Sequence, residues 1–110
     1  MCTCSYAGTI GGGVSNYISG YASNVGGGYG NSVKGDFASI GGGSSNTVSA
    51  DYSSIGGGVG NTVVSDSATI GTGYMTTIAG SSTYAYVGVG GESLISGYAS
   101  TVVGGDGHSL

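Results

Sequence analysis

A glycine-rich motif recurs every 15 residues along almost the whole chain, and this spacing restricts the possible folds more than any other feature. Each unit begins with a large aliphatic residue followed by glycines, as in Ile40-Gly41-Gly42-Gly43. Units begin near residues 10, 25, 40, 55, 70, 87 and 102, so only the step from 70 to 87 is longer, by two residues. Such self-similarity indicates a repeat architecture, in which units bury their apolar residues by stacking. The sequence therefore predicts a single repeat domain over residues 1–110.

Every unit carries two aliphatic positions eight residues apart, and these positions predict the core. A helix is a poor interpretation, because glycine costs about 1 kcal/mol relative to alanine inside a helix. Short segments that alternate small or apolar with polar residues and end in Gly or Asn are instead typical of strands and turns. The predicted core residues are Ile10, Ile18, Val25, Val33, Ile40, Val48, Ile55, Val63, Ile70, Ile78, Val87, Ile95 and Val102.

Two short strands and two turns fill 15 residues, which predicts a narrow coil of an all-β, parallel β-solenoid or β-roll. Coils of this kind stack about 4.8 Å apart, so about seven coils would span roughly 34 Å. Equivalent residues of successive units then lie above one another in columns. The Gly triplets suit tight corners with positive φ, and their missing side chains let neighbouring backbones approach closely.

The composition argues against most other classes of protein. The chain has 27 Gly, no Pro and 5% charged residues, whereas ordinary domains contain about 7% Gly and about 25% charged residues. Because catalytic sites are built mainly from charged residues and His, we expect no enzymatic activity, no catalytic residues and no cofactor. Disorder is disfavoured by a hydrophobic content of 38%. Collagen requires Gly at every third residue and abundant Pro.

The charge and hydropathy patterns restrict the partners. A net charge of -4 with one Lys and no Arg argues against a nucleic acid, because binding to phosphates depends on cationic side chains. No apolar run approaches the roughly 20 residues of a membrane span, so membrane insertion is not expected. The residues from Met1 also lack the basic start and apolar stretch of a secretory signal peptide.

Two units carry a resemblance to a known family. They are Ala38-Ser39-Ile40-Gly41-Gly42-Gly43-Ser44-Ser45-Asn46-Thr47-Val48 and Ser53-Ser54-Ile55-Gly56-Gly57-Gly58-Val59-Gly60-Asn61-Thr62-Val63. The pattern resembles the head repeats of trimeric autotransporter adhesins and is similar to repeats of haemagglutinin-like proteins and of bacteriophage or viral fibres. The resemblance covers about residues 5–110, with a slightly longer unit than usual. It implies a left-handed parallel β-roll, often with three chains side by side, used for attachment and display.

The two ends of the chain fall in nearly the same phase of the repeat. Residues 1–3 and residues 108–110 both occupy the seventh to ninth positions of a unit. Because an uncovered strand ladder invites pairing, we expect head-to-tail assembly into an open filament. The alternative is that the two ends are fragment boundaries that fall in the same phase of the repeat by chance. Cys2 and Cys4 are interpreted as unpaired thiols or small core residues, with a covalent staple between subunits as the next alternative and metal or redox chemistry as the least favoured. The predicted assembly residues are Cys2, Cys4, His108 and Leu110.

Polar residues also recur in register. The seventh position predicts a stacked ladder of amide side chains, formed by Asn16, Asn31, Asn46 and Asn61. The twelfth position predicts a column of carboxylates, formed by Asp36, Asp51 and Asp66. We expect these carboxylates to be solvated turn residues, with a calcium site as the weaker alternative, because calcium prefers oxygen ligands.

Aromatic and hydroxyl side chains provide two further columns. Tyrosines recur near the second corner of their units, at Tyr6, Tyr21, Tyr52, Tyr84 and Tyr98. Such rings pack between chains or stack on sugars, and packing is the preferred interpretation. One short threonine column is formed by Thr47, Thr62 and Thr77.

Together these features predict a non-enzymatic structural subunit that assembles with itself, as a trimer, a filament or both. Its expected location is extracellular, on a cell surface or on a virion. The alternative is an adhesin head module that binds a host surface protein or a glycan. A lesser alternative is an ice-binding solenoid, which would use the threonine column.

Overall fold

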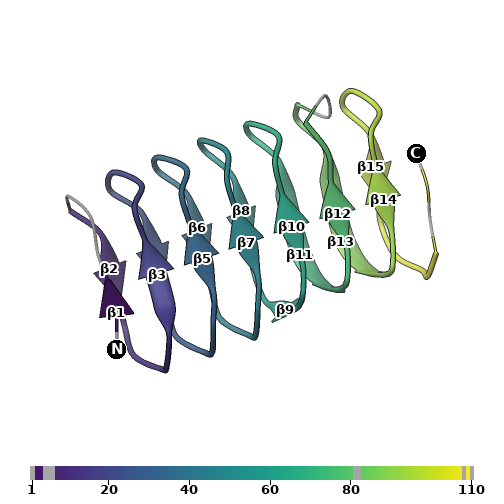
Figure 1. Cartoon of the computed structure of the whole chain (residues 1–110). Helices are drawn as coiled ribbons and strands as arrows, with labels where there is room; N and C mark the ends of the chain where they lie inside the picture. Colours follow the sequence, from purple (N-terminus) through teal and green to yellow (C-terminus); the bar gives the residue numbers. More distant parts are fainter. Residues whose placement is uncertain (1, 4–6, 81–82, 108, 110) are drawn as a thin grey trace.

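The computed structural model is an all-β solenoid in which parallel strands stack coil upon coil (Figure 1). The structure describes residues 2–3, 7–80, 83–107 and 109. The molecule measures 35 × 20 × 14 Å, and its long axis agrees with the length expected for stacked coils. The predicted parallel β-solenoid is confirmed, with about six turns rather than seven.

One sheet contains seven parallel strands that follow one another along the stack of coils. Its strands, in spatial order, are β1 (Cys2–Thr3), β3 (Asn16–Ile18), β5 (Ser32–Val33), β7 (Thr47–Val48), β10 (Thr62–Val63), β12 (Thr77–Ile78) and β14 (Leu94–Ile95). Equivalent residues pair, as Val48 does with Val63. The strands are short because a turn follows within a few residues on either side.

The second sheet contains eight strands. Its main path is β2 (Thr9–Ile10), β4 (Asn24–Val25), β6 (Ser39–Ile40), β8 (Ser54–Ile55), β11 (Thr69–Tyr74), β13 (Tyr86–Gly91) and β15 (Thr101–Val102), and β9 (Gly58–Val59) pairs with β11 beside this path. The longer unit does not disturb the register, since Ile70 still pairs with Val87 and Ile78 with Ile95. Its two extra residues therefore fall in the turn between β12 and β13.

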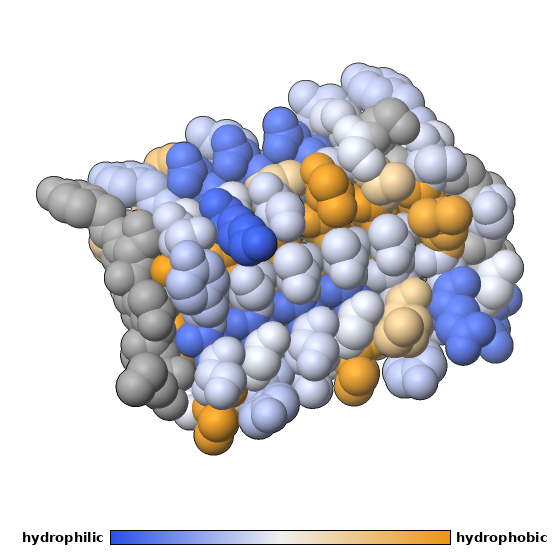
Figure 2. Space-filling model, in the orientation of Figure 1, coloured by the Kyte–Doolittle hydropathy of each residue, from blue (hydrophilic) through white to orange (hydrophobic). Residues whose placement is uncertain are grey.

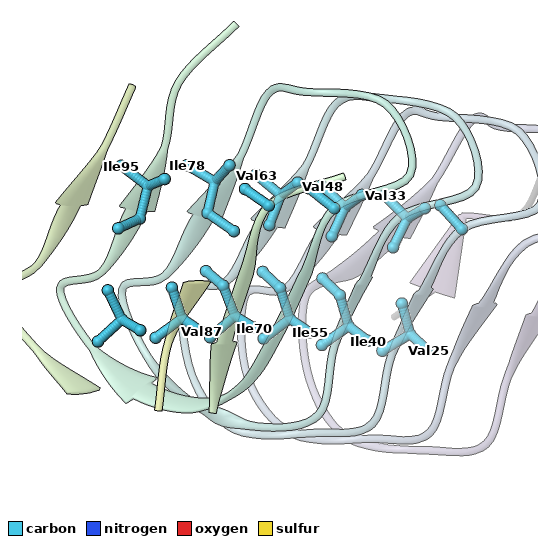
Figure 3. Packing of buried hydrophobic residues seen from close by; sticks show 14 of the residues in the cluster. Val25, Val33, Ile40, Val48, Ile55, Val63, Ile70, Ile78, Val87 and Ile95 are labelled. Carbon is cyan, nitrogen blue, oxygen red and sulfur yellow. The ribbon is translucent and has the colours of Figure 1, made fainter. Parts of the chain in front are cut away.

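The core is a thin layer of branched aliphatic side chains between the two sheets. Figure 3 shows two facing rows, with Val48 and Val63 in one and Ile40 and Ile55 in the other. Every predicted core residue is at most 5% exposed except Ile10, which is partly buried in an end coil. Each fully buried aliphatic side chain of this size contributes about 1.5–3 kcal/mol. Three small residues that the sequence analysis did not single out complete the layer: Ala38, Ala68 and Ala85.

The corner at each glycine triplet is more elaborate than the single turn that the sequence analysis expected. Gly43 has a φ of 99°, and a Cβ there would lie 2.1 Å from the carbonyl oxygen of Gly58. Just beyond it, Tyr29, Ser44 and Val59 pair in a third, one-residue-wide parallel ladder. Pairing by single residues leaves no alternation of apolar and polar residues, so the sequence pattern does not reveal this third side.

Candidate functional site

The asparagine column is a continuous polar array, and it is buried. Asn46 Nδ2 donates to Asn31 Oδ1 at 3.1 Å, to the carbonyl oxygen of Gly42 at 3.1 Å and to that of Gly58 at 2.9 Å. Asn46 Oδ1 accepts two hydrogen bonds from Asn61, one from its backbone N–H at 3.0 Å and one from its Nδ2 at 3.1 Å. The predicted amide ladder over Asn16, Asn31, Asn46 and Asn61 is confirmed. Because these groups bond one another and the backbone, they hold the coils together and present nothing to a ligand.

The aspartate column lies exposed along the turns opposite the glycine triplets. Asp51 Oδ1 accepts the backbone N–H of Asp36 at 2.8 Å, and Asp36 Oδ1 accepts that of Tyr21 at 2.8 Å. Asp66 Oδ1 accepts the N–H of Asp51 at 3.1 Å. Each carboxylate therefore closes the turn of the preceding coil, a role that the sequence analysis did not identify.

The calcium interpretation of these carboxylates gains no geometric support. Within the ranges that the structure describes, no group of three or more His, Cys, Asp or Glu side chains is arranged to hold a metal ion. The backbone hydrogen bonds of Asp36, Asp51 and Asp66 account for the column without one.

Two substitutions of Asp51 separate its hydrogen bond from its charge. Asp51→Ala removes the acceptor for the N–H of Asp36 and is expected to lower the free energy of unfolding by about 1 kcal/mol. Asp51→Asn keeps an acceptor oxygen and removes repulsion between stacked like charges, so its stability should lie within about 0.5 kcal/mol of the parent chain. Thermal unfolding at low salt compares the two; equal losses would show that the hydrogen bond is not what Asp51 contributes.

An aromatic ridge runs along the same corner; we define it as Tyr21, Phe37, Tyr52, Tyr84 and Tyr98. The centroids of the Phe37 and Tyr52 rings lie 5.3 Å apart with nearly parallel planes, and Tyr21 meets Phe37 edge-on at 5.6 Å. Tyr84 and Tyr98 form a second, edge-on pair at 6.1 Å. All five side chains are between 45% and 69% exposed. The ridge is therefore an exposed apolar surface with a fixed shape.

The outer face of the seven-stranded sheet is built from columns of small polar residues. Register pairs Thr47 with Thr62 and Thr62 with Thr77, as the sequence analysis predicted. The column continues into Ser32 and Tyr17 at one end and Leu94 at the other. Figure 2 shows the stacking as rows of like-coloured side chains along the long axis. Threonine thus occupies three consecutive coils of this column, and Thr3 pairs with Tyr17 at its far end.

The structure presents surfaces rather than an enclosed site. No pocket is found in the part of the chain that the structure describes, and none of its segments is a helix long and apolar enough to cross a membrane. Cys2 belongs to β1, and nothing is described of its side chain. The other predicted assembly residues, Cys4, His108 and Leu110, lie outside the described residues, as does Tyr6.

Comparison of the chain with protein-family models, curated proteins and solved structures gave no match.

Proposed function

We propose that the chain is a non-enzymatic structural subunit that assembles with copies of itself, end to end, into a fibre outside a cell or on a virion. The observation that carries the proposal is the uninterrupted parallel ladder along the long axis. β2 and β15 are the edge strands of one sheet, and β1 is an edge strand of the other, whose opposite end continues past β14 into the pairing of Leu94 with Ser109. Edge strands offer unpaired backbone groups to another chain, and a contact between opposite ends of identical subunits generates an open filament.

The chemistry of the coils supports a structural role. Contacts between coils consist of aliphatic columns, a buried amide ladder and backbone hydrogen bonds such as that from the Gly41 N–H to the carbonyl oxygen of Ile55, at 2.9 Å. Each coil therefore presents to the next a surface that already matches its neighbour. The resemblance to fibre and adhesin-head repeats supports the same class of function.

Val103 is the position that decides how well two copies can join. It occupies the place that Gly88 and Gly56 hold in earlier coils, and a Cβ at Gly88 would lie 2.6 Å from the carbonyl oxygen of Val103. The Val103 side chain is 80% exposed, and in a continued ladder it would meet the carbonyl of the incoming coil. The junction must therefore open locally at this residue.

Val103→Gly is expected to favour end-to-end assembly, because it removes this clash. Overpacking typically costs about 1–3 kcal/mol, so the concentration at which fibres form should fall by about tenfold, which corresponds to about 1.4 kcal/mol. Val89→Gly is the matched control, since Val89 is exposed at the next position of its unit. Sedimentation across a dilution series and electron microscopy measure the change. A single small species at every concentration, for both the parent chain and Val103→Gly, would refute the proposal.

The second candidate function is an adhesin head module, and the aromatic ridge favours it. Exposed aromatic residues are enriched where proteins bind partners, and Phe37 and Tyr52 are 51% and 65% exposed. Phe37→Ser with Tyr52→Ser should abolish binding to cells, matrix protein or glycan arrays while preserving the fold, because Ser67 already occupies the same position in the next coil. Binding that survives this double substitution would argue against the ridge as the adhesive surface.

A further inference from the structure

Tyr84 and Tyr98 form an exposed tyrosine pair on the aromatic ridge, and no packing requirement explains their phenol groups. Their ring centroids lie 6.1 Å apart with planes at 89°, and the side chains are 62% and 69% exposed. A backbone hydrogen bond of 3.0 Å from the Ala99 N–H to the carbonyl oxygen of Thr83 holds the two turns in register. The rings are thus kept close together while remaining accessible.

We propose that Tyr84 and Tyr98 are a site of oxidative coupling, at which a one-electron oxidant joins two neighbouring coils through a dityrosine bond. A peroxidase with hydrogen peroxide is the class of oxidant that fits exposed phenols. It removes one electron and one proton from each phenol, and the peroxide takes up both electrons and both protons to give two water molecules.

The two phenoxyl radicals then combine at their ortho carbons, which forms one carbon–carbon bond. Each of these carbons passes its hydrogen to the phenol oxygen, so that both rings regain aromaticity and both hydroxyl groups are restored. The product is the chain less two hydrogen atoms. Its new bond closes a loop between residues 84 and 98, and closing a loop restricts the unfolded chain in the way that a disulfide does.

The position of this pair on the ridge gives it specificity. Tyr84 and Tyr98 are in mutual ring contact, whereas Phe37 contacts both Tyr21 and Tyr52. Phenylalanine has no hydroxyl group and forms no phenoxyl radical under the same oxidant. Phe37 therefore separates two tyrosines that would otherwise lie along a continuous coupling path.

The coupling is intramolecular and does not depend on the fibre proposal. Groups held side by side in one molecule react at a high effective concentration, so the yield should be independent of protein concentration. Coupling between chains would instead increase with concentration. Linkage within one chain and linkage between chains are thereby distinguishable in a single dilution series.

The test treats the full chain with peroxidase and hydrogen peroxide, then maps the products by denaturing gel, dityrosine fluorescence and peptide mass spectrometry. The expected product is a single-chain species lacking two hydrogen atoms, with residues 84 and 98 in one cross-linked peptide and a raised thermal unfolding midpoint. Tyr98→Phe should lose this peptide and retain its circular dichroism spectrum. Phe37→Tyr should gain a second cross-linked peptide containing Tyr52.

Two results would overturn the proposal. One is a chain whose dityrosine forms only between molecules, with a yield that rises with concentration. The other is a Tyr98→Phe variant that still gives the same cross-linked peptide map as the parent chain.

Discussion

Replacing Asn46 with leucine is expected to lower the free energy of unfolding by about 3 kcal/mol. Asn46 is fully buried, and leucine has nearly its shape but no polar atom. The substitution leaves the Asn61 backbone N–H and the carbonyl oxygen of Gly42 without the hydrogen bonds that the Asn46 side chain supplies, while Asn31 Oδ1 keeps only the backbone N–H of residue 46. Each buried group left unsatisfied costs about 1–3 kcal/mol. Since whole domains are stable by only about 5–15 kcal/mol, urea unfolding should show a large shift in midpoint.

Asn46→Thr provides the matched control. Thr76 already stands in this column, where its N–H donates to Asn61 Oδ1 at 3.0 Å and its hydroxyl donates to the carbonyl oxygen of Gly90 at 3.4 Å. Threonine should therefore keep part of the ladder and lose less stability than leucine. Equal and small losses for both variants would mean that hydrogen bonds along the column do not stabilise the solenoid.

The period of the sequence was sufficient to predict the columns. Ile40 and Val48 were assigned to the core, and Asn46 to a ladder, because each recurs at a fixed place in a 15-residue unit. In a stacked solenoid a fixed place in the unit becomes a fixed place on the axis, so one inference about register locates many contacts. The same period identifies the step from residue 70 to residue 87 as the one that is longer, by two residues.

Hydrogen bonds that depend on the path of the backbone through a turn cannot be predicted from the period of the sequence. The spacing of Asp51 from Asp36 shows that they stack but not that Asp51 accepts the N–H of Asp36, because the hydrogen bond depends on the path of the turn. The third ladder through Ser44 escaped detection for a related reason, since a single paired residue in a glycine-rich corner has no strand pattern. Asp36, Asp51 and Asp66 are exposed turn residues in one column, as the sequence predicts, but their hydrogen bonds to the preceding coil are not predictable from it.

The glycines of one triplet also differ in ways that the sequence does not reveal. The first glycine of each triplet faces the next coil: a Cβ at Gly56 would lie 2.2 Å from the carbonyl oxygen of Gly71. The second faces open space, since a Cβ at Gly57 would meet no atom within 4 Å. Neither residue has a positive φ. Only a steric requirement distinguishes them, although they are adjacent and chemically identical.

Gly56→Ala and Gly57→Ala should therefore have opposite effects. Real Cβ atoms do not approach a backbone oxygen as closely as 2.2 Å, so Gly56→Ala must separate two coils whose backbones are hydrogen-bonded on both sides. We expect a loss of about 3 kcal/mol or more, at the upper end of overpacking effects. Gly57→Ala fits the existing backbone and restricts the unfolded chain, which typically stabilises by about 0.4–1 kcal/mol.

Urea and thermal unfolding of the two variants, measured side by side, test whether coil-to-coil contact sets the glycine requirement. If both substitutions destabilise the chain equally, the cause would be a backbone preference common to the triplet rather than the stacking distance. If Gly56→Ala alone is destabilised, the same contact also explains why valine is accommodated at residue 103, where no described coil lies above it. The spacing between coils would then be the quantity that selects glycine, and the charge or polarity of the surface would have no part in it.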